Sequence, residues 1–359
     1  MAYNFNAGPA VLPPAVLQQA QAELCNYRGL GYSLLEASHR SPEFEEVIQA
    51  AETNIRELLG VPAGYTVLFL QGGASTQFAM IPMNLLGVGQ TAAYLESGYW
   101  AERAIKEAQL FGQVKVVGST RESGYVSLPA VAPGACPDKA AYLHLTSNNT
   151  IYGTQFHAFP EAPAGVPLIA DMSSDIMSRP VPVERFAMIY AGAQKNIGPA
   201  GVTVVIMRTE LLARTPKSVP TMLRYSTHAD NQSMYNTPPT FSIYLVRLVT
   251  DWLKREGGLG AIAKRNEAKG KAIYDLLDEG GFYRGPVQPA ARSLMNVVFR
   301  LPSEELEKKF VAGATKAGMI GLKGHRAVGG VRASLYNALD LSAAQVLADY
   351  MREFRRLNG

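Results

Sequence analysis

The sequence has little cysteine, only Cys25 and Cys136 among 359 residues. Two cysteines cannot build the disulfide framework that stabilises many small secreted domains. The N-terminal segment Met-Ala-Tyr-Asn-Phe-Asn also lacks the cationic start and the apolar core of a secretory signal peptide. We therefore expect a cytoplasmic protein whose thiols are reduced.

Long hydrophobic runs and dense basic runs are absent as well. No stretch approaches the roughly 20 consecutive apolar residues that a membrane-spanning helix requires, so we expect no membrane association. The 34 Lys and Arg residues nearly balance the 30 Asp and Glu residues, which gives a net charge of +4. Without a basic run, nucleic acid is not an expected partner. A few cations gathered in one cleft would still attract a small anionic substrate.

The sequence does contain enough apolar residues for a large core, because 47% of it is hydrophobic and only 18% is charged. Between residues 16 and 255, helical patterns alternate with seven short apolar runs: 66–70, 91–94, 114–117, 141–145, 167–170, 188–190 and 202–207. This alternation predicts an α/β fold with a mainly parallel seven-stranded sheet between helices. Ligands of such sheets bind beyond the carboxyl ends of the strands.

The two ends of the chain show a different pattern. Prolines at positions 9, 13 and 14 predict an extended arm that leads into a helix near Ala15 and packs against a distant part of the chain. The C-terminal part reads as a helix at about 259–278, a strand at 293–300, a helix at 303–317, short strands around 319–324 and 330–336, and a last helix from Ser342. We expect a large domain over residues 16–257 and a small α+β domain formed by residues 1–15 and 258–359.

Lys195 is the candidate nucleophile. It follows a short apolar run and precedes a glycine-rich turn, where burial would lower its ordinary pKa of about 10.4 and make the amine reactive toward an aldehyde. A lysine that reaches water from a loop is the competing interpretation, and it is the more common case for a single residue. Asp171 ends another apolar run, where a carboxylate would keep the ring nitrogen of a ligand protonated; a capping or turn aspartate is the alternative.

Further candidates follow strands or carry positive charge. The segment Gln71-Gly-Gly-Ala-Ser-Thr joins a strand to a helix, so its backbone donors suit a phosphate, although a simple capped turn is equally consistent. Trp100 and Thr150 each follow a strand, where the indole would stack on an aromatic ligand and the hydroxyl would bond to a ring substituent. Core packing for Trp100 and a turn hydrogen bond for Thr150 are the competing interpretations, and each is the more common case for a single residue. Three cationic groups would bind carboxylates or phosphates: His39-Arg40, His325-Arg326 and Arg332. Charged side chains that are simply solvated at the surface are the alternative. The histidines and cysteines show no zinc-type spacing, so we expect no metal.

Taken together, these segments resemble the phosphoserine aminotransferase family, a class V branch of the fold-type I pyridoxal-phosphate enzymes, over nearly the whole chain. The phrases that carry the resemblance are Phe-Asn-Ala-Gly-Pro-Ala, Ser-His-Arg, Gln-Gly-Gly-Ala-Ser-Thr-Gln-Phe, Ala-Asp-Met-Ser-Ser-Asp, Tyr-Ala-Gly-Ala-Gln-Lys-Asn, Tyr-Asn-Thr-Pro-Pro and Gly-Leu-Lys-Gly-His-Arg. The resemblance implies pyridoxal 5'-phosphate as cofactor. It also implies reversible transfer of the amino group of L-glutamate to 3-phosphohydroxypyruvate in serine biosynthesis, and a second role at the 4-phosphohydroxy-L-threonine step of pyridoxine biosynthesis.

The same resemblance implies a role for each candidate residue toward the cofactor. Lys195 would bind it covalently, Asp171 would hold its pyridine nitrogen, and Trp100 would stack on its ring. Thr150 would bond the ring hydroxyl. The cofactor phosphate would be held by Ala74, Ser75 and Gln194, with Asn236 and Thr237 of the partner subunit. We therefore expect a homodimer whose active sites are shared between subunits.

The resemblance also implies how the substrate binds. Arg40 and Arg332 would hold its carboxylate, and His39, His325 and Arg326 would hold its phosphate. Some family members carry Gly-Arg-Gly where this chain has Ala74-Ser75-Thr76, so here the cofactor phosphate would depend on hydroxyls and backbone donors. Some also carry a lysine soon after the His-Arg pair, where this chain has Pro42.

Four alternatives remain at this stage. An aminotransferase for an unphosphorylated acid would not need the paired His-Arg segments. A cysteine desulfurase would need a mobile thiol near the cofactor, and neither cysteine lies in a suitable segment. A nicotinamide-dependent oxidoreductase would use spaced Gly-x-Gly-x-x-Gly glycines, which this chain lacks. The fourth alternative is a non-catalytic relative, although every expected reactive residue is present.

Overall fold

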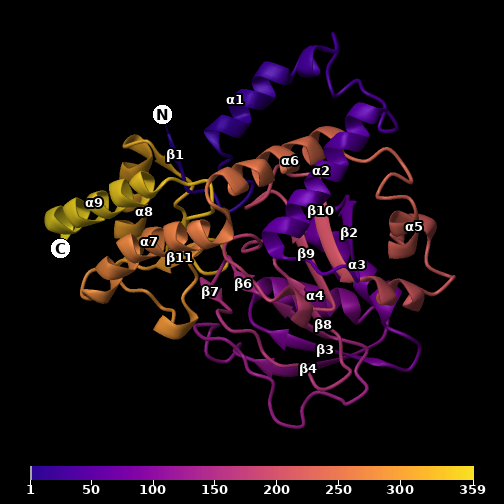
Figure 1. Cartoon of the computed structure of the whole chain (residues 1–359). Coiled ribbons are helices and arrows are strands. Elements are labelled where there is room, and N and C mark those ends of the chain that lie inside the picture. The colour runs from indigo at the N-terminus through magenta and orange to yellow at the C-terminus, as the bar shows by residue number, and fades with distance from the viewer. Residues whose placement is uncertain (1) are drawn as a thin grey trace.

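The computed structural model describes residues 2–359 and has the predicted α/β architecture (Figure 1). Its central sheet contains seven strands in the order β2-β10-β9-β8-β5-β3-β4. In chain order these strands are β2 (Tyr65–Leu70), β3 (Thr91–Glu96), β4 (Gln113–Ser119), β5 (Leu143–Thr146), β8 (Leu168–Asp171), β9 (Met188–Gly192) and β10 (Thr203–Arg208). Each strand overlaps one of the seven apolar runs, so the fold prediction is confirmed.

The sheet is mainly parallel, as expected. The pairs β9–β8, β8–β5, β5–β3 and β3–β4 are parallel, whereas β10 pairs antiparallel with both β2 and β9. The carboxyl ends of β5, β8 and β9 therefore meet at one edge of the sheet, and the residues that follow them are brought together there.

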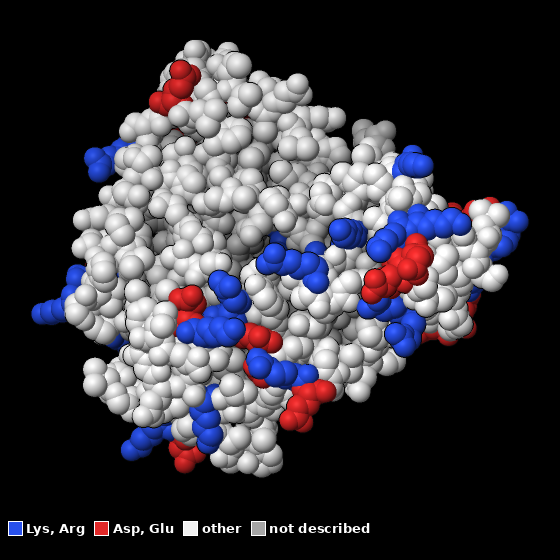
Figure 2. Space-filling view, turned by 180° about the vertical axis from the view of Figure 1, so that it is seen from behind, with Lys and Arg blue, Asp and Glu red and all other residues white. Residues whose placement is uncertain are grey.

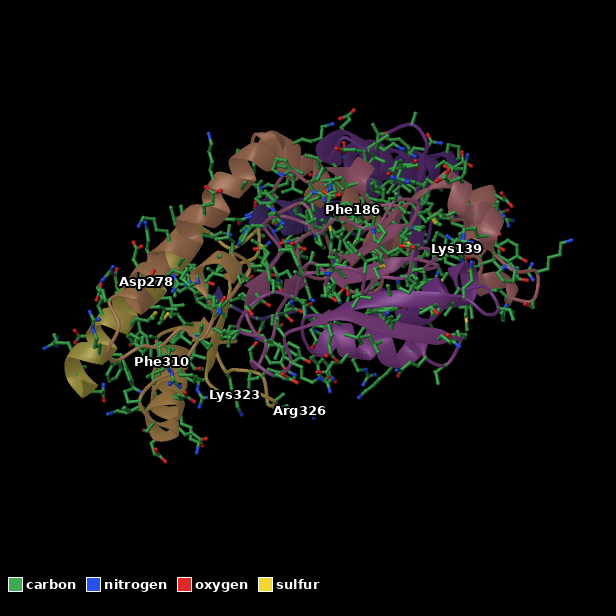
Figure 3. The ribbon with its side chains drawn as sticks, turned by 90° about the horizontal axis from the view of Figure 1, so that it is seen from below. Lys139, Phe186, Asp278, Phe310, Lys323 and Arg326 are labelled. Atoms are coloured by element: carbon green, nitrogen blue, oxygen red, sulfur yellow. The ribbon has the colours of Figure 1, made fainter. Side chains whose placement is uncertain are left out.

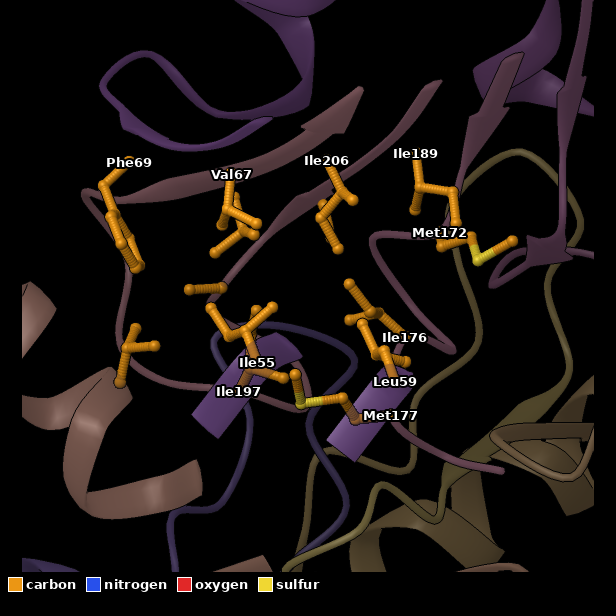
Figure 4. Packing of buried hydrophobic residues seen from close by; sticks show 14 of the residues in the cluster. Ile55, Leu59, Val67, Phe69, Met172, Ile176, Met177, Ile189, Ile197 and Ile206 are labelled. Carbon is orange, nitrogen blue, oxygen red and sulfur yellow. The ribbon is translucent and has the colours of Figure 1, made fainter. Parts of the chain in front are cut away.

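Helices cover both faces of the sheet. One layer contains α2 (Pro42–Leu59) and α6 (Thr240–Arg255), against which α1 (Pro14–Glu23) packs; the other contains α3 (Gly73–Leu85), α4 (Tyr99–Ala108) and α5 (Tyr225–Asp230). Figure 4 shows Ile55 of α2 packed beneath Val67 and Ile206 of the sheet. Because side chains alternate along a strand, Val67 belongs to the first layer and Leu68 to the second. Burial on both faces explains why the strands read as continuous apolar runs.

The C-terminal part forms a second group of elements beside the sheet (Figure 1). It comprises α7 (Gly258–Asp278), β11 (Asn296–Phe299), α8 (Glu304–Lys316), β12 (Met319–Ile320), β13 (Val331–Ser334) and α9 (Leu341–Asn358). Short elements complete the chain: the strand pair β6 (Asn148–Asn149) and β7 (Thr154–Gln155), and the 3₁₀ helices η1 (Tyr27–Gly29), η2 (Val183–Arg185), η3 (Thr209–Arg214), η4 (Thr221–Leu223) and η5 (Pro289–Ala291). Among residues 2–359, no helix is both long and apolar enough to cross a membrane.

The N-terminal arm does pack against a distant segment. Its strand β1 (Tyr3–Asn4) pairs in parallel with β12, and the arm residue Phe5 is fully buried among residues of α7, α8 and α9. We propose the division into residues 16–257 and residues 1–15 with 258–359, because the hydrophobic cluster around Phe5 draws its other members only from residue 273 onward and from Tyr3 and Val11.

The predicted strand at 319–324 is shorter than expected. The chain turns at Gly321, whose φ of +84° favours glycine. A Cβ on Gly321 would lie 2.4 Å from the Asn6 side chain, so the arm also requires glycine here. This close approach involves residues that are far apart in the sequence, and local patterns do not reveal it.

Candidate active site

A cavity of about 380 Å³ lies at the carboxyl ends of β5, β8 and β9. Most of the residues singled out in the sequence line this one cavity, although they come from seven separate places in the chain. These are Ala74, Ser75, Trp100, Thr150, Asp171, Gln194, Lys195, His325 and Arg332. A volume of this size is typical of small-molecule sites.

Lys195 lies three residues beyond the end of β9 and faces the cavity. Burial lowers the pKa of its amine, the Asp171 carboxylate opposes that shift, and the Arg332 guanidinium adds to it. The amine lies 5.9 Å from the centre of the Trp100 ring. A lysine whose pKa is lowered in this way has more of the neutral amine that attacks a carbonyl carbon.

Asp171 is the last residue of β8 and lies on the same face of the sheet as Ile169, toward α3 and α4. It is 5% exposed, and its Oδ1 accepts a hydrogen bond of 2.9 Å from the Ser173 backbone N–H. Burial raises the pKa of its carboxyl, while Ser173 and Lys195 lower it. A buried carboxylate of this kind is well suited to a cationic N–H donor such as a protonated ring nitrogen.

The first turn of α3 forms another wall of the cavity. It follows β2 through Gly72, whose φ is +89°, and its first backbone N–H groups have no acceptor within the helix. The Thr76 hydroxyl donates to the Gly72 carbonyl over 3.0 Å, so this hydroxyl stabilises the turn itself. The backbone N–H groups of Ala74 and Ser75 at the positive helix end therefore suit a phosphate group.

Trp100, Thr150 and Arg332 are joined by hydrogen bonds. The Trp100 indole N–H donates to the Thr150 hydroxyl over 3.1 Å, and the Arg332 guanidinium donates to the Thr150 carbonyl over 3.0 Å. Burial lowers the pKa of the Arg332 guanidinium. Its Nε is buried and has no partner within residues 2–359, so Arg332 keeps donor capacity for an anionic ligand.

Comparison with known proteins places this geometry in a family. The pattern of the family described as aminotransferase class-V matches residues 2–347. The chain belongs to the class-V aminotransferases. The class V membership predicted from the resemblance is confirmed. This membership argues against a nicotinamide-dependent oxidoreductase.

Individual relatives agree over the whole length of this class-V aminotransferase. It is 54% identical over 356 residues to a phosphoserine aminotransferase of Geobacillus kaustophilus (strain HTA426), a match that covers 99% of this chain and 98% of the relative. The solved structure of phosphoserine aminotransferase from Bacillus circulans subsp. alkalophilus is 54% identical, with a TM-score of 0.98 and coverage of 100% and 99%. A PLP-bound phosphoserine aminotransferase from Trichomonas vaginalis is 37% identical, with a TM-score of 0.91 and coverage of 98% and 100%.

Several cavity residues of the class-V aminotransferase were not singled out in the sequence. Thr146 ends β5 and its hydroxyl is buried without a partner in the described chain, while Asn148 donates to Ser174 over 2.8 Å and to Asn296 over 2.9 Å. Ser173 and Ser174, which follow Asp171 by two and three residues, also line the cavity. The feature of the sequence that could have identified them is their position, because all of them lie within three residues of the carboxyl end of a strand.

Five sequence candidates do not line this cavity within the single chain. Thr237 and His39 lie 3.2 Å apart, from Oγ1 to Nδ1, while Asn236 is partly buried and Arg40 is exposed. Arg326 lines a neighbouring cavity of about 650 Å³ that shares His325 with the first. Figure 3 shows Arg326 and Lys323 on one loop beside the C-terminal helices. The roles expected of these five residues stay predictions.

Proposed function

We propose that this class-V aminotransferase is a pyridoxal-phosphate-dependent phosphoserine aminotransferase. It transfers the amino group of L-glutamate reversibly to 3-phosphohydroxypyruvate, which yields O-phospho-L-serine and 2-oxoglutarate. The observation that carries the proposal is the convergence of Lys195 and Asp171 on one cavity, in a chain 54% identical to a relative of that name. Asp171 ends β8 and Lys195 follows its parallel neighbour β9, at the end of the sheet where ligands bind.

The residues present fit the cofactor. Asp171 would hold the ring nitrogen, Trp100 would cover the ring, and Thr150 would bond to a ring substituent. The first turn of α3, with Ser75 and Gln194, would hold the phosphate, joined by Asn236 and Thr237 of the partner subunit. When bound, pyridoxal phosphate supplies an aldehyde that condenses with amines and a ring that withdraws electrons from the α-carbon of an amino acid.

The side chains of this protein divide the remaining tasks between them. The Lys195 amine would hold the cofactor, and the same amine would move a proton to and from the α-carbon of the substrate. Burial lowers the pKa of Lys195, which increases the share of the neutral amine that this role requires. The Asp171 carboxylate favours positive charge at the ring nitrogen. Arg332 has a free donor for the α-carboxylate.

Substrate choice would depend on the cationic segment His325-Arg326. A phosphate and the side-chain carboxylate of glutamate are both anions, so one subsite formed by this segment and His39 would serve both half-reactions. Arg326→Ala should lower kcat/KM for 3-phosphohydroxypyruvate about 100-fold or more, as expected for a lost charge-assisted pair, and should spare hydroxypyruvate, which has no phosphate. Arg255→Ala, an exposed position at the end of α6, is the matched control. An equal loss for both keto acids would contradict the assigned substrate.

A second substrate is part of the proposal. The phosphorylated four-carbon analogue that leads to 4-phosphohydroxy-L-threonine presents the same phosphate and carboxylate as 3-phosphohydroxypyruvate. We therefore include the corresponding step of pyridoxine biosynthesis. Turnover of the two keto acids by the same preparation tests this step, and failure of the four-carbon acid to react would remove it.

A homodimer is also proposed, on the evidence of exposed apolar side chains in one segment of the chain. Leu17, Leu24, Leu30, Tyr32 and Leu35 are exposed within a single N-terminal segment. Exposed apolar side chains in this density mark an interaction surface. Figure 2 shows few charged side chains on the upper part of the face it presents, at the height of α1 in Figure 1. We propose a cytoplasmic location too, supported by the unpaired state of Cys25 and Cys136.

A further inference from the structure

The N-terminal arm is fixed at both of its ends. Near the start, the backbone N–H of Tyr3 donates to Gly318 over 2.8 Å and that of Phe5 donates to Ile320 over 2.9 Å. Further along, the backbone N–H of Ala10 donates over 2.8 Å to the carbonyl of Gln194. The arm therefore runs from the β12 strand to the residue that precedes Lys195.

The middle of the arm forms part of the cavity wall. The carbonyl of Ala7 accepts a 2.8 Å hydrogen bond from the hydroxyl of Tyr336, a side chain that is 1% exposed. Gly8 follows with a φ of +138°, a conformation that favours glycine. A Cβ on Gly8 would lie 3.4 Å from Cγ and 3.5 Å from Cε of Lys195. The methylene chain of the lysine therefore lies over the open side of Gly8, at van der Waals distance from the place that a Cβ would occupy.

We propose that Tyr336 and Gly8 are positioning residues for Lys195. The Tyr336 hydroxyl holds the Ala7 carbonyl. The arm, held in this way, keeps Gly8 against the methylene groups of Lys195 and excludes water from that side of the amine. Since Tyr336 follows β13 and Gln194 follows β9, the arm also links the C-terminal elements to the lysine. The inference rests on the proposed function, because it assumes that Lys195 carries the cofactor.

The charged groups around Lys195 set the direction of the expected effect. Asp171 and Asp175 favour its protonated form, Arg332 disfavours it, and burial disfavours it most. An arm that no longer covers the lysine admits water, and hydration favours the protonated nitrogen. The lysine nitrogen should then titrate at higher pH, and the cofactor should leave faster.

Tyr336→Phe tests the hydrogen bond to the arm. We expect the visible absorbance band of the cofactor-loaded protein to titrate at a pH higher by about half a unit or more. We also expect the cofactor to dissociate faster, by about threefold or more. The matched control is Tyr283→Phe, which removes a 2.7 Å bond from an equally buried hydroxyl to the Met351 carbonyl, away from the arm. Tyr283→Phe should change the melting temperature but neither of these readouts.

Gly8→Ala tests the contact with the lysine. It should shift the same titration and dissociation rate, whereas Gly31→Ala should not, because Gly31 also has a positive φ of +82° but no described atom within 4 Å of an added Cβ. If both arm variants keep the titration and dissociation rate of the wild type, the inference is overturned. A wild-type protein that shows no cofactor band would instead contradict the proposed function, so the two failures are distinguishable.

Discussion

Lys195 and Asp171 illustrate at the residue scale how burial prepares a site. Burial lowers the pKa of the lysine amine and raises that of the aspartate carboxyl, so both charged forms are disfavoured while each partly stabilises the other. Both were identifiable in the sequence because Asp171 ends the apolar run that forms β8 and Lys195 lies three residues beyond β9. The hydrogen bond from Arg332 to the Thr150 carbonyl was not, because 182 positions separate the two residues.

Lys269 lies outside the cavity and is also buried at 0% exposure. Its ammonium group donates to the carbonyls of Leu335 over 2.8 Å and Tyr336 over 2.7 Å. Burial lowers its pKa to about 7, with Arg265 adding to this shift and Asp340 opposing it. Since an unfolded lysine titrates near 10.4, the unfolded chain binds more protons between these values. The stability contributed by Lys269 is therefore present above about pH 10.4 and is lost as pH falls toward 7.

Lys269→Met should remove this dependence. The difference in unfolding free energy between wild type and variant should grow as pH rises from about 7 to about 10, as measured by urea unfolding at several pH values. Lys271→Met, at an exposed position on the same helix, is the control and should show a nearly constant difference. A constant difference for Lys269→Met as well would show that the buried lysine does not titrate in this range.

At the scale of elements, the seven strands of the sheet were predictable because burial on both faces makes each one a continuous apolar run. The strand β1 was not predictable, since it has two residues and its partner β12 lies more than 300 positions away. The polar residues Asn148 and Ser174, which line the cavity, were not predicted for a similar reason. Asn148 bonds to Ser174 and Asn296, and serine and asparagine after a strand look like ordinary turn residues in a sequence.

The turn before α3 provides a prediction at this scale. An added Cβ on Gly72 would lie 1.9 Å from Oγ1 and 2.6 Å from Cβ of Thr76, and because rotation of the side chain cannot move that Cβ, Gly72→Ala must displace the first helical turn. We expect the affinity for pyridoxal phosphate to fall about tenfold or more, because the backbone donors for its phosphate would move. Binding is measured by titrating the cofactor-free protein and following its absorbance.

Gly60→Ala provides the matched control. Gly60 ends α2 with a φ of +63°, and the described chain places no atom within 4 Å of an added Cβ. This variant should lose about 1 kcal/mol of stability and keep its cofactor affinity. Equal affinities for Gly72→Ala and Gly60→Ala would show that the α3 turn does not hold the phosphate.

At the scale of the whole molecule, the sequence indicated where the large and the small group of elements lie along the chain. It did not indicate which part of the folded surface would form a dimer interface. The proposed dimer surface includes Leu35, which is 57% exposed. Leu35→Glu should make the dimer dissociate at concentrations where the wild type stays associated, as measured by sedimentation velocity. Cofactor affinity should fall with it, because Asn236 and Thr237 are proposed to serve the partner's site.

Val88→Glu is the control for this surface. Val88 is fully exposed on the loop between α3 and β3, at the opposite edge of the sheet from the cavity. It should leave the sedimentation behaviour unchanged. A Leu35→Glu protein that stays associated, with wild-type cofactor affinity, would contradict the proposed interface.

The central claim is that Lys195 carries the cofactor, and borohydride reduction tests it most directly. The reagent fixes the bond between a lysine and pyridoxal phosphate, so that mass spectrometry of the digested protein identifies the modified residue. The account predicts a yellow protein that borohydride bleaches irreversibly, with the cofactor mass on the peptide that contains Lys195. A colourless protein after addition of the cofactor, or a label on Lys269 instead of Lys195, would contradict it.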